Sequence, residues 1–165
     1  MTAKIRTLRS AGAALVILAL AAGLPLAASN LAGAQEPGAA APAPATLYRR
    51  LGGYDSLAVL TDDFIGRLVR DRSLSRFFSG ASEEAKGRIR QHLLDQLCAA
   101  SGGPCLYVGR DMKTAHRGLG IGEADWAATV GHLIASLDRH GIAPKEKDEV
   151  LAIVAGLKKG IVEKP

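Results

Sequence analysis

The stretch SGGPCLYVGRDMKTAH, residues 101–116, decides the fold of this chain. Its first four residues must end the preceding helix, because glycine takes the left-handed conformation at a helix end and proline cannot continue the hydrogen-bond ladder. A loop runs over 105–109, and residues 111–116 have room for only one to two helical turns. The stretch therefore predicts a helix, a loop and a short helix that carries His116.

Longer helices are predicted on both sides of this stretch. Apolar residues recur every three or four positions over 54–70, over 123–139 and from Pro144 onward, which is the period of a helix with one buried face. Ser82, followed by two acids, is a good start for a further helix, because its hydroxyl can cap free N–H groups. That helix is expected to bury a stripe of apolar residues: Ile89, Leu93, Leu94 and Leu97.

Four substantial helices joined by glycine-rich connections, with no convincing strand, indicate an all-α fold. A short segment over 74–78 places Phe77 beside Phe78 between two of these helices. The length fits one domain. A domain of roughly 120 residues with few aromatics has a modest hydrophobic core, and a buried prosthetic group would help to stabilise it.

The N-terminal 46 residues read as a separate region. Lys4, Arg6 and Arg9 precede an apolar run over 11–26 and small residues at 32–34, which is the pattern of a signal peptide over 1–34. The alternative is an uncleaved anchor, because the run approaches the length of a spanning helix. We expect export, to the periplasm or anchored to the inner membrane, with a Pro/Ala-rich linker over 35–46 and a domain over 47–163.

Removing residues 1–34 takes three positive charges from the formal net charge of +5 and leaves +2. No block of Lys and Arg with interleaved aromatics remains, so we expect no nucleic-acid partner. Cys98 and Cys105 are the only cysteines, and an oxidising compartment would allow them to form a disulfide. The absence of C-x-x-C-H excludes the usual covalent c-type haem attachment.

Two of the four histidines are candidates for chemistry. His132 lies within a predicted helix and His140 beside a helix-ending glycine, so both are interpreted as structural or solvated. His92 and His116 lie on helices separated by the Gly-Gly-Pro turn, where they could supply ligands on the two sides of a haem. Spacing alone leaves the other reading open, since a lone histidine in a short helix is more often a core residue.

Several strings together resemble the group I truncated haemoglobins. They are LYRRLGG (47–53), DF (63–64), FF (77–78) and, most specifically, GGPCLYVGRDMKTAH (102–116). The resemblance runs from Leu47 to about Val162. It implies a two-over-two helical sandwich around haem b, with His116 as the proximal iron ligand, Phe78 packed on the porphyrin face, and Tyr107 and Met112 along the proximal edge.

The distal side departs from the family's commonest pattern. Many members have a tyrosine after the Asp-Phe pair, where this chain has Ile65, so one hydrogen-bond donor to a bound gas is missing. Aligning the Gly-Gly-Pro turn without gaps places Ile89 and Leu93 over the iron. An apolar pocket of this kind would hold polar bound oxygen poorly.

The same alignment puts His92 where some members carry a histidine that binds the iron as a sixth, internal ligand. Gln91 or Gln96 is then the remaining polar candidate, and a shift of one or two residues would aim Gln91 inward instead. An internal ligand must be displaced by an incoming gas, which slows association and favours redox or sensing roles.

The resemblance implies a haem protein that binds O₂, NO or CO and serves in oxygen binding, NO detoxification or redox sensing. A side activity of the NO dioxygenase or peroxidase kind, and a reductase or other electron donor, would be compatible with it. The alternative is a haem-free helical interaction module on the same scaffold. A hydrolase is disfavoured, because no nucleophile, base and orienting acid occur in a recognisable arrangement.

Overall fold

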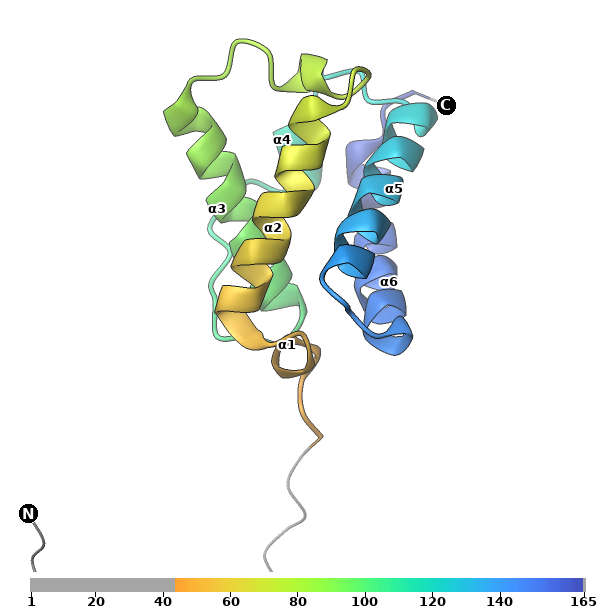
Figure 1. Cartoon of the computed structure of the whole chain (residues 1–165). Helices are drawn as coiled ribbons and strands as arrows, with labels where there is room; N and C mark the ends of the chain where they lie inside the picture. The colour runs from red at the N-terminus through yellow and green to blue at the C-terminus, as the bar shows by residue number, and fades with distance from the viewer. Residues whose placement is uncertain (1–43, 165) are drawn as a thin grey trace, which may run out of the picture. The chain divides into compact units, whose positions relative to one another are not determined.

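The structure, a computed structural model, describes residues 44–164 (Figure 1). The leader expected over 1–34 and most of the linker expected over 35–46 lie outside the described residues. Within them the chain is helical, with no strand and one isolated bridge between Gly122 and Lys164. The elements are α1 (Leu47–Arg50), α2 (Gly53–Arg70), the 3-10 turn η1 (Ser75–Phe77), α3 (Glu83–Ala100), α4 (Met112–His116), α5 (Glu123–Arg139) and α6 (Pro144–Ile161).

The helix ends follow the capping signals in the sequence. The Ser82 side chain accepts a hydrogen bond from the Ala85 N–H at the start of α3, and Pro144 occupies the first turn of α6. Gly102, with φ of 82°, takes the left-handed conformation just after α3. The helix predicted over 123–139 is confirmed as α5, and the all-α fold is confirmed. Helix α1 is an additional single turn that the apolar periodicity did not indicate.

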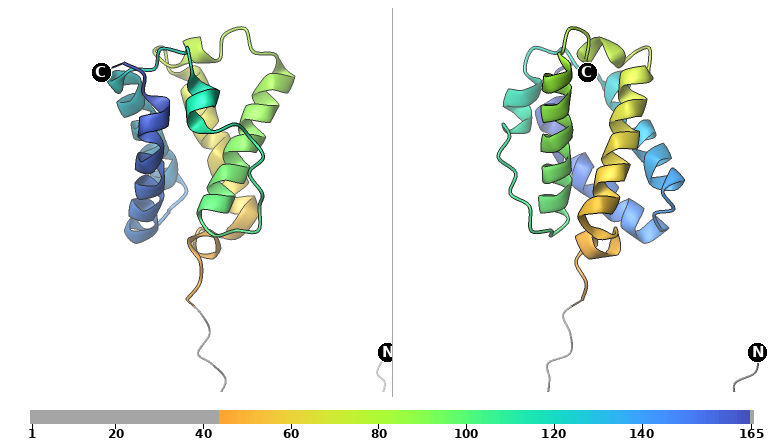
Figure 2. Two further views of the ribbon diagram at one scale, coloured as in Figure 1. Left: turned by 180° about the vertical axis from the view of Figure 1, so that it is seen from behind. Right: turned by 60° about the vertical axis from the view of Figure 1, so that its left-hand side comes forward.

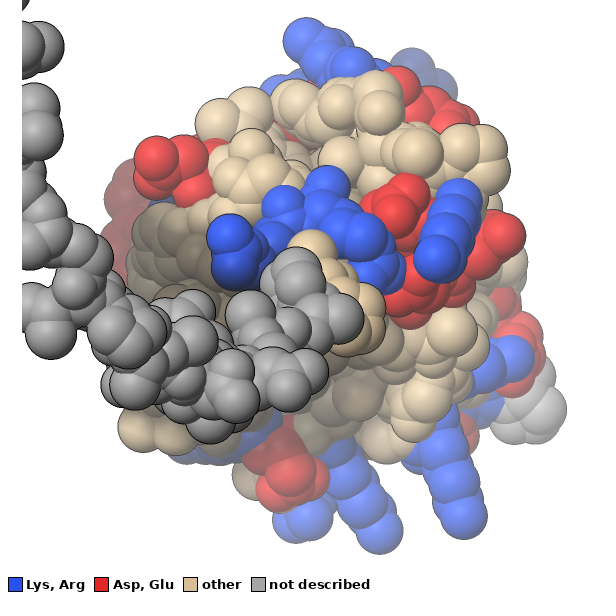
Figure 3. All heavy atoms as spheres, turned by 90° about the horizontal axis from the view of Figure 1, so that it is seen from below, with Lys and Arg blue, Asp and Glu red and all other residues tan. Residues whose placement is uncertain are grey.

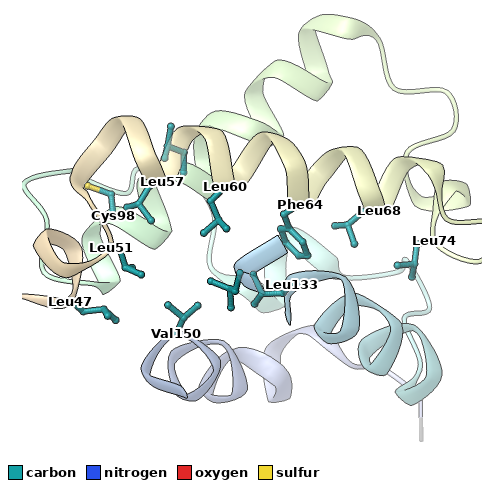
Figure 4. Packing of buried hydrophobic residues seen from close by; sticks show 12 residues of the cluster. Leu47, Leu51, Leu57, Leu60, Phe64, Leu68, Leu74, Cys98, Leu133 and Val150 are labelled. Atoms are coloured by element: carbon teal, nitrogen blue, oxygen red, sulfur yellow. The ribbon is translucent and has the colours of Figure 1, made fainter. Parts of the chain in front are cut away.

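The core lies where α2 crosses α5 and α6 (Figure 4). Leu57, Leu60 and Phe64 of α2 point toward Leu133 of α5 and Val150 of α6, and all five side chains are buried. Helix α2 also packs along α3, so the α2–α3 pair lies against the α5–α6 pair (Figures 1 and 2). Two pairs of helices packed in this way form the predicted two-over-two sandwich.

The stripe predicted to be buried on α3 is partly wrong. Leu94 is buried, but Ile89 is 41% exposed, and Cys98 rather than Leu97 is the other fully buried residue of the helix. The reason is that α3 turns the face bearing positions 94 and 98 toward α2. Positions 89, 92 and 96 lie on the opposite face, since α-helical residues advance by about 100° each, whereas Leu93 lies between the two faces and still packs against the core.

Charged residues of both signs are intermingled on the face shown in Figure 3. Arg50 illustrates why, because its guanidinium binds the carboxylates of Glu146 and Glu149 on α6. Lys147 likewise pairs with Asp138 at 2.6 Å.

None of the helices within 44–164 combines the length and the hydropathy needed to cross a membrane.

Candidate functional site

His116 is the last residue of α4, a helix of only five residues that lies between α3 and α6 when the molecule is seen from behind (Figure 2). The Asp111 carboxylate starts this helix by accepting a hydrogen bond from the Thr114 N–H at 2.9 Å. The His116 Nδ1 lies 2.8 Å from the carbonyl oxygen of Met112. A carbonyl oxygen only accepts, so Nδ1 carries a proton, and in the neutral imidazole it is Nε2 that has the free lone pair.

The rotation of α3 is fixed by polar contacts with α2. The Arg90 guanidinium makes two hydrogen bonds to the Asp62 carboxylate, one of them 2.8 Å long. The Gln91 amide donates to the Tyr54 hydroxyl at 3.1 Å and to Asp95 at 2.8 Å. Gln91 is therefore held at the exposed α2–α3 edge, whereas Gln96 shares the opposite face of α3 with His92.

His92 is half-buried, and its Nδ1 is buried without a hydrogen-bond partner among the described residues. The ring packs edge-to-face on Tyr107, with 6.1 Å between the ring centroids. Tyr107 donates its hydroxyl proton to the carbonyl oxygen of Arg110 at 2.5 Å, and burial raises the pKa of this phenol. Tyr107 thus lies against α3 as well as in the loop that leads to α4.

A disulfide between Cys98 and Cys105 ties the 101–109 loop to the end of α3, with 5.7 Å between the two Cα atoms. The bond that an oxidising compartment would allow is therefore formed in the structure. Gly103 makes the close approach possible, because a Cβ at this position would lie 2.7 Å from the Cys98 Sγ and 2.6 Å from the Tyr48 ring. Tyr107 follows two residues after Cys105, so the disulfide also limits where its ring can lie.

The other predicted site residues lie just after η1, on α2 and on α3. Phe78 follows η1 and is half-buried against the core, while its neighbour Phe77 is covered by the Arg76 guanidinium. Ile65 lies on α2, half-buried, directly after the core residue Phe64. Ile89 shares the face of α3 that carries His92, and Leu93 lies between that face and the core.

These residues fit a haem. The proximal candidate presents an imidazole nitrogen whose tautomer is set by a backbone carbonyl, as iron ligation by histidine requires. Helix α3 offers apolar residues that protein atoms leave partly uncovered, with Ile89 as the most exposed of them. It also offers, in His92, a buried ring nitrogen without a partner.

Comparisons with known proteins agree with this geometry. Residues 46–163 match the family described as bacterial-like globin. The group 1 truncated hemoglobin GlbN of Mycolicibacterium paratuberculosis is 34% identical over 114 residues, which cover 69% of this chain and 82% of that protein.

Two solved structures are similar in fold. The structure of Chlamydomonas reinhardtii THB1 has a TM-score of 0.63 and 30% sequence identity, covering 73% of this chain and all of that one. The 2/2 hemoglobin from Synechococcus sp. PCC 7002, described in the cyanomet state with covalently attached heme, has a TM-score of 0.66 and 26% identity. The match covers 72% of this chain and 98% of the Synechococcus chain.

The fold and the histidine-bearing helix α4 are those of a two-over-two globin. Within that class the chain belongs to the bacterial-like globin family, as a group 1 truncated haemoglobin. It is accordingly a haem protein whose function is the binding of diatomic gases, and the alternative of a haem-free interaction module is disfavoured.

Proposed function

We propose that this truncated haemoglobin works outside the cytoplasm as a gas-responsive or redox-active haem b protein. Its proximal ligand would be His116 and its internal sixth ligand His92. The observation that carries the proposal is the hydrogen bond from His116 Nδ1 to the Met112 carbonyl, which leaves Nε2 as the donor atom. When bound, the haem would supply an iron centre that takes nitrogen and gas ligands and can change its oxidation state.

On the proximal side, the chain's contribution is orientation. The Asp111 cap and the Nδ1 hydrogen bond fix the short helix and the plane of the imidazole, so that His116 loses little rotational freedom on binding. Met112 provides the carbonyl that accepts the Nδ1 proton and also packs against α6 at Gly160. The partial negative charge of that carbonyl makes Nε2 a stronger electron donor.

On the distal side, Ile65, Ile89 and Leu93 provide apolar walls, and no tyrosine follows the Asp-Phe pair of α2. These walls exclude water but offer no hydrogen bond to a polar ligand. His92 and Gln96 are the polar residues on the same face of α3. Binding of His92 would require a gas to displace it first, which supports redox sensing or NO detoxification over oxygen storage.

Two features support export. The positive leader, apolar run and small residues of 1–34 form a signal-peptide pattern, and retention of that segment would anchor the protein to the inner membrane. The Cys98–Cys105 disulfide adds independent support, since disulfides persist in oxidising compartments and are rare in the cytosol. An electron donor in the same compartment would return the iron to its ferrous state.

The distal assignment is tested by absorption spectra of the dithionite-reduced protein. We expect a six-coordinate low-spin spectrum in the parent and a five-coordinate high-spin spectrum in His92→Ala. His132→Ala is the matched control, because His132 is also half-buried but binds Asp71 at 2.8 Å instead. A parent spectrum that is five-coordinate and unchanged by His92→Ala would refute the internal ligand.

Export is tested by fractionating cells that express the full chain and by measuring the mass of the recovered protein. We expect it in the periplasmic fraction with its N-terminus near Gln35. Recovery of the uncleaved chain from the membrane fraction would support anchoring, and recovery from the cytosol would refute export.

A further inference from the structure

The position of His116 depends on what holds the two ends of α4. A helix of five residues is not stable alone, because helix nucleation is unfavourable until many hydrogen bonds have formed. The Asp111 cap holds the first turn. After His116 the chain leaves the helix at Arg117, so the orientation of the histidine is set by whatever fixes the segment that follows.

That segment is held by a single carboxylate from the C-terminal end of the chain. Glu163 Oε1 accepts a hydrogen bond from the Gly118 N–H at 2.7 Å, and Oε2 accepts one from the Gly120 N–H at 2.6 Å. Both glycines have positive φ, 80° and 67°, so the turn presents its two amide groups to the same carboxylate. These bonds hold the pKa of Glu163 below its usual value, so the carboxylate is ionised at neutral pH.

The backbone around Glu163 strengthens the same attachment. The N–H groups of Glu163 and Lys164 both donate to the Ile121 carbonyl, at 2.8 and 3.2 Å. Nearer the start of α4, Gly160 of α6 allows close approach, because a Cβ there would lie 3.0 Å from the Met112 Cβ. The end of α6 and the residues after it therefore hold α4 at both of its ends.

We propose that Glu163 is a positioning residue for the proximal histidine. By holding the Gly118 and Gly120 amides, it sets the place of the His116 backbone and with it the tension on a bond from Nε2 to iron. The link is short, since the Leu119 N–H in the same turn donates to the His116 carbonyl at 3.2 Å. This inference rests on the proposed role of His116.

The test is the iron–histidine stretching frequency, measured by resonance Raman spectroscopy on the ferrous full-chain protein. All variants carry His92→Ala, so that His116 is the only protein ligand to the iron. Glu163→Gln keeps the size of the side chain but replaces one acceptor oxygen by an NH₂ group that faces an N–H donor. We expect it to shift the stretching frequency by several wavenumbers and to accelerate haem loss to a scavenger protein several-fold.

Glu123→Gln is the matched control. Glu123 lies near the same end of the molecule, and its carboxylate pairs with Lys158 of α6 at 2.8 Å without contacting the 117–120 turn. We expect this variant to keep the parent frequency. A lowered thermal midpoint in Glu163→Gln with an unmoved stretching frequency would show a purely structural role and overturn the inference.

A second measurement needs no substitution at Glu163. In the unsubstituted holoprotein, the Gly118 and Gly120 amide protons should exchange slowly with solvent, and fast exchange of both would overturn the inference. The two proposals fail in different ways. If the iron–histidine stretching band persists in His116→Ala, both the ligand assignment and this inference are refuted. If the band depends on His116 but its frequency is the same in Glu163→Gln, only this inference is refuted.

Discussion

Gly103 lies so close to Cys98 and Tyr48 that only a hydrogen atom fits in place of a side chain. A Cβ at this position would lie 2.8 Å from the Cys98 carbonyl oxygen, which belongs to the backbone and cannot move aside as a side chain can. We expect Gly103→Ala to lower the free energy of unfolding by about 1–3 kcal/mol, as overpacking usually does. Urea denaturation followed by circular dichroism measures this change.

The control is Gly156→Ala, in the middle of α6, where a Cβ would meet nothing within 4 Å. It should raise stability by about 0.5–1 kcal/mol, because alanine loses less backbone entropy than glycine in a helix. Equal effects of the two substitutions would contradict the account of the loop.

Asp71 makes stability depend on pH. Its carboxylate accepts hydrogen bonds from the Ser73 hydroxyl and N–H, from the Leu74 N–H and from His132, and the Ser73 hydroxyl is the main cause that lowers its pKa far below 3.8. A carboxylate with a lowered pKa stabilises the fold fully above its unfolded pKa, and this stabilisation is lost as the pH falls through the folded value.

We therefore expect Asp71→Asn to lower the thermal midpoint at pH 7 and the deficit to shrink as the pH falls below about 4. Thermal melts of the parent and the variant across this range measure it. Asp148→Asn, which changes an exposed carboxylate on α6, is the control. A deficit that stays constant down to acidic pH would mean that the charge of Asp71 does not matter.

The roles of His92 and His116 stay predictions, and the structure adds the contacts that surround them. The resemblance named His116, and the structure places this residue at the end of α4 with its Nδ1 beside the Met112 carbonyl oxygen. The choice between Gln91 and Gln96 stayed open, because it depends on the rotation of α3, which the Arg90–Asp62 and Gln91–Tyr54 contacts fix from another helix. Glu163 was missed, since no local pattern indicates that a residue after the last helix will bind amides of Gly118 and Gly120.

At the scale of elements, the disulfide joins α3 to the loop that leads to α4. In the chain-entropy account, closing a loop this short stabilises the fold by about 2–3 kcal/mol. We expect dithiothreitol to lower the free energy of unfolding by that amount, and a Cys98→Ala/Cys105→Ala double variant to be insensitive to it. An identical denaturation midpoint in the reduced and oxidised parent would contradict this expectation.

The capping residues predicted where helices begin, but the sequence did not predict which residues of α3 are buried. Ser82, Asp111 and Pro144 each start a helix where local physics places them. Ile89 has the spacing of a core residue but is 41% exposed, because the face of α3 that packs on α2 is chosen by partners distant in the sequence. Periodicity identifies an apolar face without saying whether protein or a prosthetic group will cover it.

At the scale of the whole molecule, the two helix pairs and the short helix α4 serve one purpose. Helix α2 forms the core with α5 and α6 (Figure 4). We assign the face of α3 that bears His92, and the histidine of α4, to the haem. In this arrangement His116 is the residue that we propose holds the haem iron.

The most direct test is the Soret absorption of purified residues 35–165 after haem is added, for the parent, His116→Ala and His132→Ala. We expect a Soret band in the parent and in His132→Ala, and its loss or strong weakening in His116→Ala. A parent that binds no haem, or a His116→Ala variant whose Soret band matches that of the parent, would contradict this assignment.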